Sequence, residues 1–187
     1  MVESWYVGID PGKSGAMAVI RKDKTTDIYD FDLDLYIEIL KDIKEVSNII
    51  PIYLGVEKVH SMPNQGVSST FTFGQRLGEI EGVLKTIGFK YELIPPQVWQ
   101  KSCGIPPKSD KKAIASIISS YFPLANLNGP RGGLKDGRSD ALGIAYYLKQ
   151  KYMERFKNLY PSSSIAENPK FIEHVRFWME YITNEDI

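Results

Sequence analysis

The order of β-prone and helical stretches in the first third of the chain most constrains its fold. β-Prone runs occupy residues 5–9, 16–20, 28–31 and 52–56, and the gap before the last run has apolar residues at helical spacing, Leu35, Ile39, Ile43 and Val46. Three short runs in close succession predict an antiparallel meander, and the 3.6-residue period predicts a helix. We therefore expect β-β-β-α followed by a further strand.

The rest of the chain alternates helices with one more strand. We expect a helix over 71–87, a strand over 91–94, one or two helical turns over 97–102, a helix capped by Ser109 that ends near residue 121, and a helix over about 138–152. The tail opens with Pro161-Ser-Ser-Ser164, a linker signal, and continues with apolar residues at helical spacing. The predicted division is a main domain, 1–153, and a linker with an amphipathic helix, 154–187.

Three glycines recur at every fourth position of the predicted helix 71–87, namely Gly74, Gly78 and Gly82. Each costs about 1 kcal/mol of helix stability relative to alanine, so a close approach of another backbone is expected to compensate. Packing on the protein's own sheet and packing at a two-fold dimer interface both explain the pattern.

Composition limits the class of protein. A chain of 187 residues with 43% hydrophobic and 25% charged residues is typical of one globular domain with a hydrophobic core. Because no stretch reads as a membrane span or a secretory signal, we expect a cytoplasmic protein without a membrane partner. The single Cys103 has no second thiol for a disulfide or a zinc site. It is expected to be a buried or loop thiol without a chemical role.

Two predicted strands deliver a carboxylate into the following loop, Asp10 after the first and Glu57 after the fourth. On neighbouring strands, two such charges would repel each other by about 4 kcal/mol at roughly 4 Å and an effective dielectric constant of about 20. A divalent cation would remove this cost, and ligands that offer oxygen alone suit Mg²⁺ or Mn²⁺. Two such ions in one site can activate a water and stabilise the leaving oxygen of a phosphodiester.

Two further acids open the helix predicted near residue 138. If Asp136 and Asp140 both lie in the helix, their four-residue spacing puts them on one face, and if Asp136 precedes it, its carboxylate still borders the first turn. We predict both as metal ligands. The alternative makes Asp136 a helix cap and Asp140 a solvated acid favoured by the helix dipole.

The segment Gly12-Lys13-Ser14 is similar to the end of a nucleotide-binding P-loop. The first glycine of that motif would fall at position 7, which is Val7, and a strand follows instead of a helix. No nucleotide cofactor is expected.

A meander, a helix and further strands alternating with helices make the ribonuclease H-like arrangement, a mixed five-stranded sheet (three antiparallel strands, then parallel ones) flanked by helices. Within this class, the sequence resembles the RuvC-type Holliday junction resolvases, particularly their bacteriophage branch. The resemblance spans about residues 5–148. Its main motifs are Gly8-Ile-Asp10-Pro-Gly12, Gly55-Val-Glu57-Lys-Val59, Gly74-Gln-Arg-Leu-Gly78, Pro95-Pro-Gln97-Val98 and Asp136-Gly-Arg-Ser-Asp140-Ala-Leu.

The resemblance implies a metal-dependent endonuclease in which Asp10, Glu57, Asp136 and Asp140 bind Mg²⁺, or Mn²⁺ in its place. It also implies a homodimer that makes paired nicks near a four-way DNA junction, whose approximate two-fold symmetry matches that of an isologous dimer. His60 follows the fourth strand, where bacterial relatives carry an aromatic that enters the junction. We predict that His60 stacks on a base or acts on water or a phosphate; a surface histidine without a role is the alternative.

Basic residues beside the acids would neutralise DNA phosphates, although the formal net charge of the chain is zero. Lys111 or Lys112 matches the basic position of the family. The alternative is an ordinary solvated helix face. The predicted DNA contacts, besides His60, are Lys101, Lys108, Lys111, Lys112, Arg131, Lys135 and Arg138.

Other functions remain compatible with parts of this pattern. A general flap-cutting or branch-cutting endonuclease would use the same acids. A catalytically inactive junction-binding module would not need all four, which are present here. A sugar-kinase or actin-like ATPase shares a strand that ends in Asp-x-Gly, but it needs a second domain that 187 residues do not accommodate.

Overall fold

The computed structural model describes the backbone of residues 4–21, 25–58 and 67–159, and the side chains of these segments except 67–69 and 156–159. A single five-stranded sheet has the order β3-β2-β1-β4-β5, in which β1, β2 and β3 are antiparallel and β4 and β5 run parallel to β1. This confirms the predicted ribonuclease H-like sheet. The elements are β1 Trp5–Asp10, β2 Ala16–Ile20, β3 Thr26–Asp30, α1 Leu33–Val46, β4 Ile52–Glu57, α2 Val67–Ile87, β5 Glu92–Ile94, α3 Pro96–Ser102, α4 Lys111–Tyr121 and α5 Asp136–Leu159.

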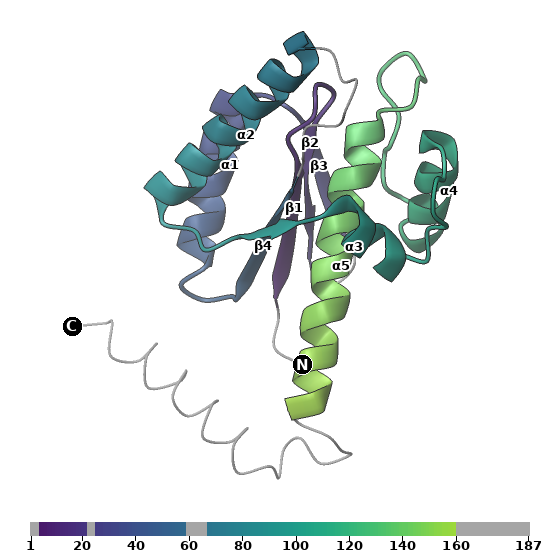
Figure 1. The fold of residues 1–187 in the computed structure, drawn as a ribbon. Helices are drawn as coiled ribbons and strands as arrows, with labels where there is room; N and C mark the ends of the chain where they lie inside the picture. The colour runs from purple at the N-terminus through teal and green to yellow at the C-terminus, as the bar shows by residue number, and fades with distance from the viewer. Residues whose placement is uncertain (1–3, 22–24, 59–66, 160–187) are drawn as a thin grey trace, which may run out of the picture. The chain divides into compact units, whose positions relative to one another are not determined.

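Helices cover both faces of the sheet, with α1 and α2 on one side and α3, α4 and α5 on the other (Figure 1). Side chains alternate between these faces along each strand. Val7, Ile9, Leu54 and Val56 of β1 and β4 pack into a core with residues of α1 and α2, including Tyr36, Leu40, Ile80 and Leu84. Burial of this core on the α1 and α2 side fixes which residues must face α5.

Glycines on β1 and on α5 itself allow α5 to lie close to the sheet. A Cβ added to Gly8 of β1 would stand 2.1 Å from the carbonyl oxygen of Ala141, and one added to Gly137 would stand 2.0 Å from that of Ser14. These distances are far below van der Waals contact, so any side chain at either position would push α5 away. The start of α5 is thus held against β1 and the turn that follows it.

Several helix boundaries differ from the sequence predictions: α2 begins at Val67 instead of residue 71, and α5 continues to Leu159 instead of ending near residue 152. The cap of α4 is Asp110, whose carboxylate accepts from the Ala113 N–H at 2.8 Å, whereas Ser109 donates its hydroxyl to the Pro106 carbonyl at 2.8 Å. The prediction of Ser109 as the cap was wrong because this hydroxyl closes its own preceding turn. α5 begins at Asp136, two residues before the predicted start.

The glycine stripe of α2 does not pack on the protein's own sheet. A Cβ added to Gly74, Gly78 or Gly82 would meet nothing within 4 Å among the described residues. The helix instead contacts the core through Ile80 and Leu84, which are 1% and 0% exposed. Of the two explanations for the stripe, packing on the sheet is therefore excluded, and the dimer interface remains a prediction.

The chain divides into two compact units, Met1–Leu148 and Lys149–Ile187, and α5 continues from the first into the second. The predicted linker signal and amphipathic helix fall within 160–187, outside the described residues, as does His60. None of the described helices is both long and apolar enough to cross a lipid bilayer. Cys103 is buried, as predicted, and burial raises the pKa of its thiol to about 12.

Candidate active site

The ends of two adjacent parallel strands bring Asp10 and Glu57 to one edge of the sheet. Ile9 of β1 is paired with Val56 of β4, so the next residue of each strand is an acid. Ile9 and Val56 face α1 and α2, and the alternation of side chains therefore turns both acids toward α5. Asp10 is 7% and Glu57 9% exposed. The sequence prediction that these two strands are neighbours is confirmed.

The first turn of α5 brings two more acids to the same edge. Asp136 is the first residue of the helix, and Asp140 lies one turn further on. Residues four apart share a helix face, and Ile144, a further turn along, is fully buried. Asp140 therefore faces the sheet and is half-buried.

Burial and neighbouring negative charges raise the pKa of three of these carboxyl groups. Burial raises the pKa of Asp10 to about 6, with a smaller contribution from the charge of Asp136. Burial, and then the charge of Asp10, raise the pKa of Glu57 to about 7. The pKa of Asp140 is also well above its ordinary value because of burial and the charges of the other three acids. The site thus holds more negative charge than its own surroundings stabilise.

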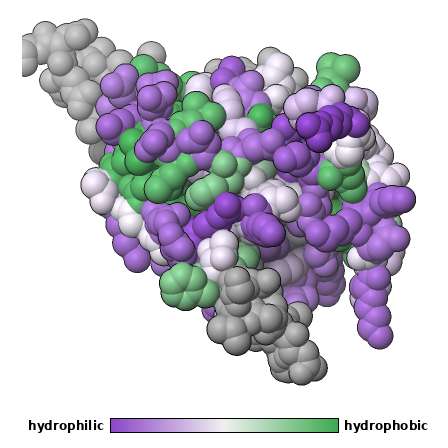
Figure 2. Space-filling model, turned by 90° about the horizontal axis from the view of Figure 1, so that it is seen from above, coloured by the Kyte–Doolittle hydropathy of each residue, from purple (hydrophilic) through white to green (hydrophobic). Residues whose placement is uncertain are grey.

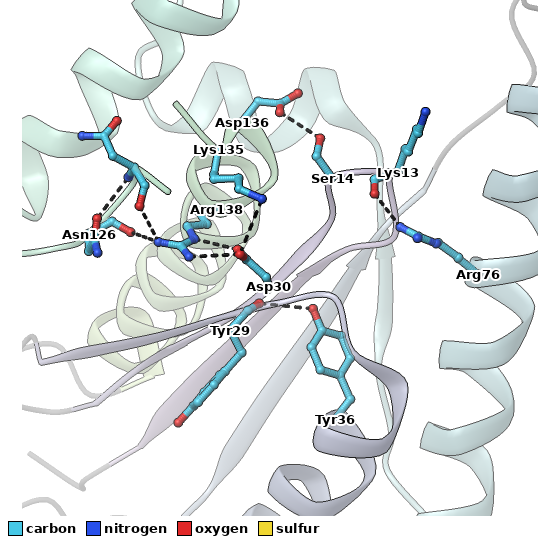
Figure 3. Close-up of polar contacts among 11 residues, drawn as sticks. Lys13, Ser14, Tyr29, Asp30, Tyr36, Arg76, Asn126, Lys135, Asp136 and Arg138 are labelled. Carbon is cyan, nitrogen blue, oxygen red and sulfur yellow. Dashed lines mark hydrogen bonds and ion pairs between the residues drawn. The ribbon is translucent and has the colours of Figure 1, made fainter. Parts of the chain in front are cut away.

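Asp136 is the exception. Burial raises its pKa, but hydrogen bonds from Lys111 and Ser14 outweigh burial and lower it. The Ser14 hydroxyl donates to Asp136 Oδ1 at 2.9 Å (Figure 3), and the Lys111 ammonium forms an ion pair with Oδ2. Lys111 is the first residue of α4, directly after the cap Asp110, so the start of this helix lies beside the acids.

Trp99 of α3 was not predicted as a site residue, although it contacts an acid directly. Its indole N–H donates to Glu57 Oε1 at 3.0 Å, and its ring is fully buried. The ring also packs on α5, because a Cβ added to Gly143 would stand 2.6 Å from Trp99 Cζ3. One side chain therefore fixes Glu57 relative to the helix that carries Asp140. An aromatic residue in a short helix gives no sequence signal for this contact.

Arg138, predicted as a DNA contact, has its guanidinium engaged within the protein. Nε and Nη2 donate to the two carboxylate oxygens of Asp30 at 2.7 and 3.1 Å, and Nη1 donates to the carbonyls of Asn126 and Asn128 at 3.1 and 2.8 Å (Figure 3). Lys135 also approaches Asp30, at 3.7 Å. These contacts favour a structural role for Arg138, which holds the loop before α5 against the end of β3.

The other predicted basic residues lie on α3, on α4, in the segment between them and in the loop before α5. Lys108 adopts a positive φ of 62°, an infrequent conformation for a lysine. Their exposed side chains are available to a partner and, Lys111 aside, make no contact with the four acids that the structure records. These exposed residues are Lys101, Lys108, Lys111, Lys112 and Arg131.

The four carboxyl groups fit divalent cations in ligand type and in charge. All the ligands offered are oxygen atoms, which hard cations such as Mg²⁺ and Mn²⁺ prefer. In residues 4–21, 25–58 and 67–159, no three His, Cys, Asp or Glu side chains already lie close enough together to share one ion. To share an ion, the carboxylates must turn toward one another, and Asp136 must leave Lys111 to join them.

Comparisons with known proteins support the fold. No protein-family model and no curated protein matches the chain. The structure of Thermus thermophilus RuvC matches with a TM-score of 0.50 and 16% identity, over 81% of this chain and 96% of that chain. T. thermophilus RuvC in complex with a Holliday junction substrate matches with a TM-score of 0.49 and 14% identity, over 82% and 96%. At these identities the likeness establishes the fold alone.

Proposed function

We propose that this chain is a metal-dependent, structure-specific endonuclease that resolves Holliday junctions or other branched DNA by paired phosphodiester hydrolysis. The observation that carries the proposal is the gathering of Asp10, Glu57 and Asp140 at one edge of the sheet, where burial raises the pKa of all three and the charge of Asp10 raises the pKa of the other two further. Ionisation of these three acids lowers the stability of the folded protein, and acids with strongly raised pKa values are typical of binding and catalytic sites. The motif resemblance and the fold support DNA as the substrate.

Asp10, Glu57, Asp140 and, after release from Lys111, Asp136 would hold the ions, which we take to be two Mg²⁺. Bound there, the ions would neutralise the acids, activate water and stabilise the leaving oxygen of the phosphodiester. Trp99 keeps Glu57 in place through its N–H. Gly12 does the same for Asp10, because its N–H donates to Oδ1 at 2.9 Å. Asp10 and Glu57 thus each have one carboxylate oxygen held by the protein itself.

Exposed basic residues beside this edge would bind the DNA backbone. Lys111 already pairs with one acid of the site, and its side chain is 73% exposed. When cations bind the Asp136 carboxylate, we expect the Lys111 ammonium to leave it and to pair with a DNA phosphate instead. Binding by Lys101, Lys108, Lys112 and Arg131 would be independent of sequence and would weaken steeply with salt.

We further propose that two copies associate through the open face of α2. The glycine stripe Gly74, Gly78 and Gly82 permits close approach of a second backbone. Phe71, on the same helix, is 73% exposed. Figure 2 shows hydrophobic residues gathered on the side where α1 and α2 lie. In sedimentation experiments Gly78→Leu should convert a dimer into a folded monomer, and an unchanged dimer would exclude this face.

The proposed activity is tested with four-way, three-way, flap and linear DNA of matched sequence, with Mg²⁺ or with a chelator. We expect paired symmetric nicks in the four-way substrate, dependent on Mg²⁺. Asp10→Asn and Glu57→Gln should abolish nicking and retain junction binding, whereas Glu38→Gln, an exposed acid of α1, should cut normally. Cutting by either site variant at the parental rate would refute the metal assignment.

The same substrates separate the two remaining alternatives. Equal cutting of flaps and forks would identify a general branch-cutting endonuclease. Junction binding without cutting in Mg²⁺ or Mn²⁺ would identify an inactive binding module. The presence of all four acids, three of them at a cost to stability, favours the active enzyme.

A further inference from the structure

The turn between β1 and β2, residues 11–15, connects two of the acids. At one end the Gly12 N–H donates to Asp10 Oδ1 at 2.9 Å, and at the other the Ser14 hydroxyl donates to Asp136 Oδ1 at 2.9 Å. The position of this turn therefore determines where both carboxylates point. Its backbone is closed by the Gly15 N–H, which donates to the Gly12 carbonyl at 2.9 Å, but Lys13 and Ser14 at its tip are exposed, so a contact from outside the turn can fix their position.

Arg76 of α2 provides that support. Its Nη1 donates to the carbonyl oxygens of Gly12 at 2.8 Å and of Lys13 at 2.7 Å, and Figure 3 shows the guanidinium directed at this turn. Its Cζ also lies 4.3 Å from the centre of the Phe31 ring, within the range of a cation–π contact. The guanidinium is thus held on two sides and joins residues that lie 63 and 64 positions apart in the chain.

We propose that Arg76 is a positioning residue that holds the 11–15 turn and, through Gly12 and Ser14, orients Asp10 and Asp136 for the reaction. The inference rests on the proposed nuclease function, which makes these two acids ligands. Arg76 differs from Lys111, which also lies near the acids, because the hydrogen bonds of Arg76 go to backbone carbonyls and do not compete with a bound ion. It keeps its positive charge near Asp10 whether or not the acids bind a cation.

The placement of Arg76 on α2 also connects the acids to the surface proposed for the second copy. Arg76 lies two residues from Gly74 and from Gly78, which turns it about 200° around the helix from each. The glycine face of α2 and the face on which Arg76 contacts the turn are therefore on different sides of the same helix. An anchor with only a structural role would stabilise α2 without affecting the acids, and the experiment must separate the two roles.

The test compares Arg76→Met, which removes charge and donors but retains an unbranched stem over Phe31, with Arg76→Lys. Lys85→Met is the matched control, because Lys85 lies on the same helix with a side chain 66% exposed. Two properties are measured in the full chain: hydrogen exchange of a peptide covering residues 9–17, and the Mn²⁺ concentration that gives half of the maximal thermal stabilisation. Neither readout requires DNA cleavage.

We expect Arg76→Met to accelerate exchange in the 9–17 peptide and to raise the half-saturating Mn²⁺ concentration about 10-fold to 100-fold, as for other residues that orient metal ligands. Arg76→Lys should recover part of both effects, and Lys85→Met should show neither. If Arg76→Met does not fold, as judged by circular dichroism, Arg76→Lys carries the test with smaller changes in the same direction.

Unchanged exchange in the 9–17 peptide would overturn the proposal, and so would faster exchange with an unchanged Mn²⁺ requirement, because the turn would then not orient the acids. If the parental protein itself neither binds Mn²⁺ nor cuts DNA, the proposed function fails. The exchange measurement still decides in that case whether Arg76 holds the turn.

Discussion

Replacing Asp10 by asparagine should stabilise the protein while abolishing its proposed activity. The structure raises the pKa of Asp10 from 3.8 to about 6 by burial. The folded protein therefore keeps this proton at pH values where the unfolded chain has lost it. The resulting stability is complete below about pH 4 and is lost as pH rises through 6. The pKa of Asp10 differs by about two units between the folded and the unfolded state, and each unit corresponds to about 1.4 kcal/mol. Above pH 7, the ionised Asp10 carboxylate therefore lowers the free energy of unfolding by about 3 kcal/mol.

Asparagine keeps the oxygen that accepts from the Gly12 N–H and never acquires the charge. In denaturant unfolding with a chelator present, Asp10→Asn should exceed the parental free energy of unfolding by about 2–3 kcal/mol near pH 8 and by little near pH 4. Glu38→Gln, an exposed acid, should differ from the parent by less than about 0.5 kcal/mol at both pH values. The reasoning is refuted if Asp10→Asn is no more stable than the parent near pH 8, or if its gain is the same at both pH values.

Three further predictions follow from the contacts. Gly143→Ala places a Cβ 2.6 Å from Trp99 Cζ3 and should lower the free energy of unfolding by about 1–3 kcal/mol. Gly78→Ala has open space around it and should raise the free energy of unfolding of the monomer by up to about 1 kcal/mol. Equal effects of the two variants in urea unfolding would contradict this. Trp99→Phe keeps the ring but not the donor to Glu57, so Mn²⁺ affinity measured by calorimetry should fall at least about tenfold, and unchanged affinity would remove Trp99 from the site. Arg138→Met should lower stability by about 1–2 kcal/mol in urea unfolding with little change in junction affinity; the opposite pattern would restore Arg138 as a DNA contact.

The fold could be predicted from the sequence because local patterns determined each element and their order determined the sheet. The alternation in β1 that buries Val7 and Ile9 against α1 and α2 also determines that Asp10 faces α5. The same holds for Glu57 on β4. Which acids lie together was therefore readable from strand order and side-chain alternation, two strong and local signals.

The contacts that orient the acids could not be predicted, because they join residues far apart in the chain and carry no local pattern. The Trp99 indole meets Glu57 across 42 positions, and the Ser14 hydroxyl meets Asp136 across 122. Arg138 was predicted from its charge alone, and charge does not reveal that Asp30 lies opposite. The glycine pattern of α2 predicted close packing without saying against what.

The central claim is that Asp10, Glu57, Asp136 and Asp140 together bind divalent ions. Anomalous X-ray diffraction from crystals grown with Mn²⁺ tests it most directly, since the signal locates the metal without assumptions about the protein. We predict anomalous peaks between the carboxylates of Asp10, Glu57 and Asp140, with Lys111 moved away from Asp136. Manganese bound only elsewhere, or no peak beside Asp10 in Mn²⁺ concentrations that support cutting, would contradict the account.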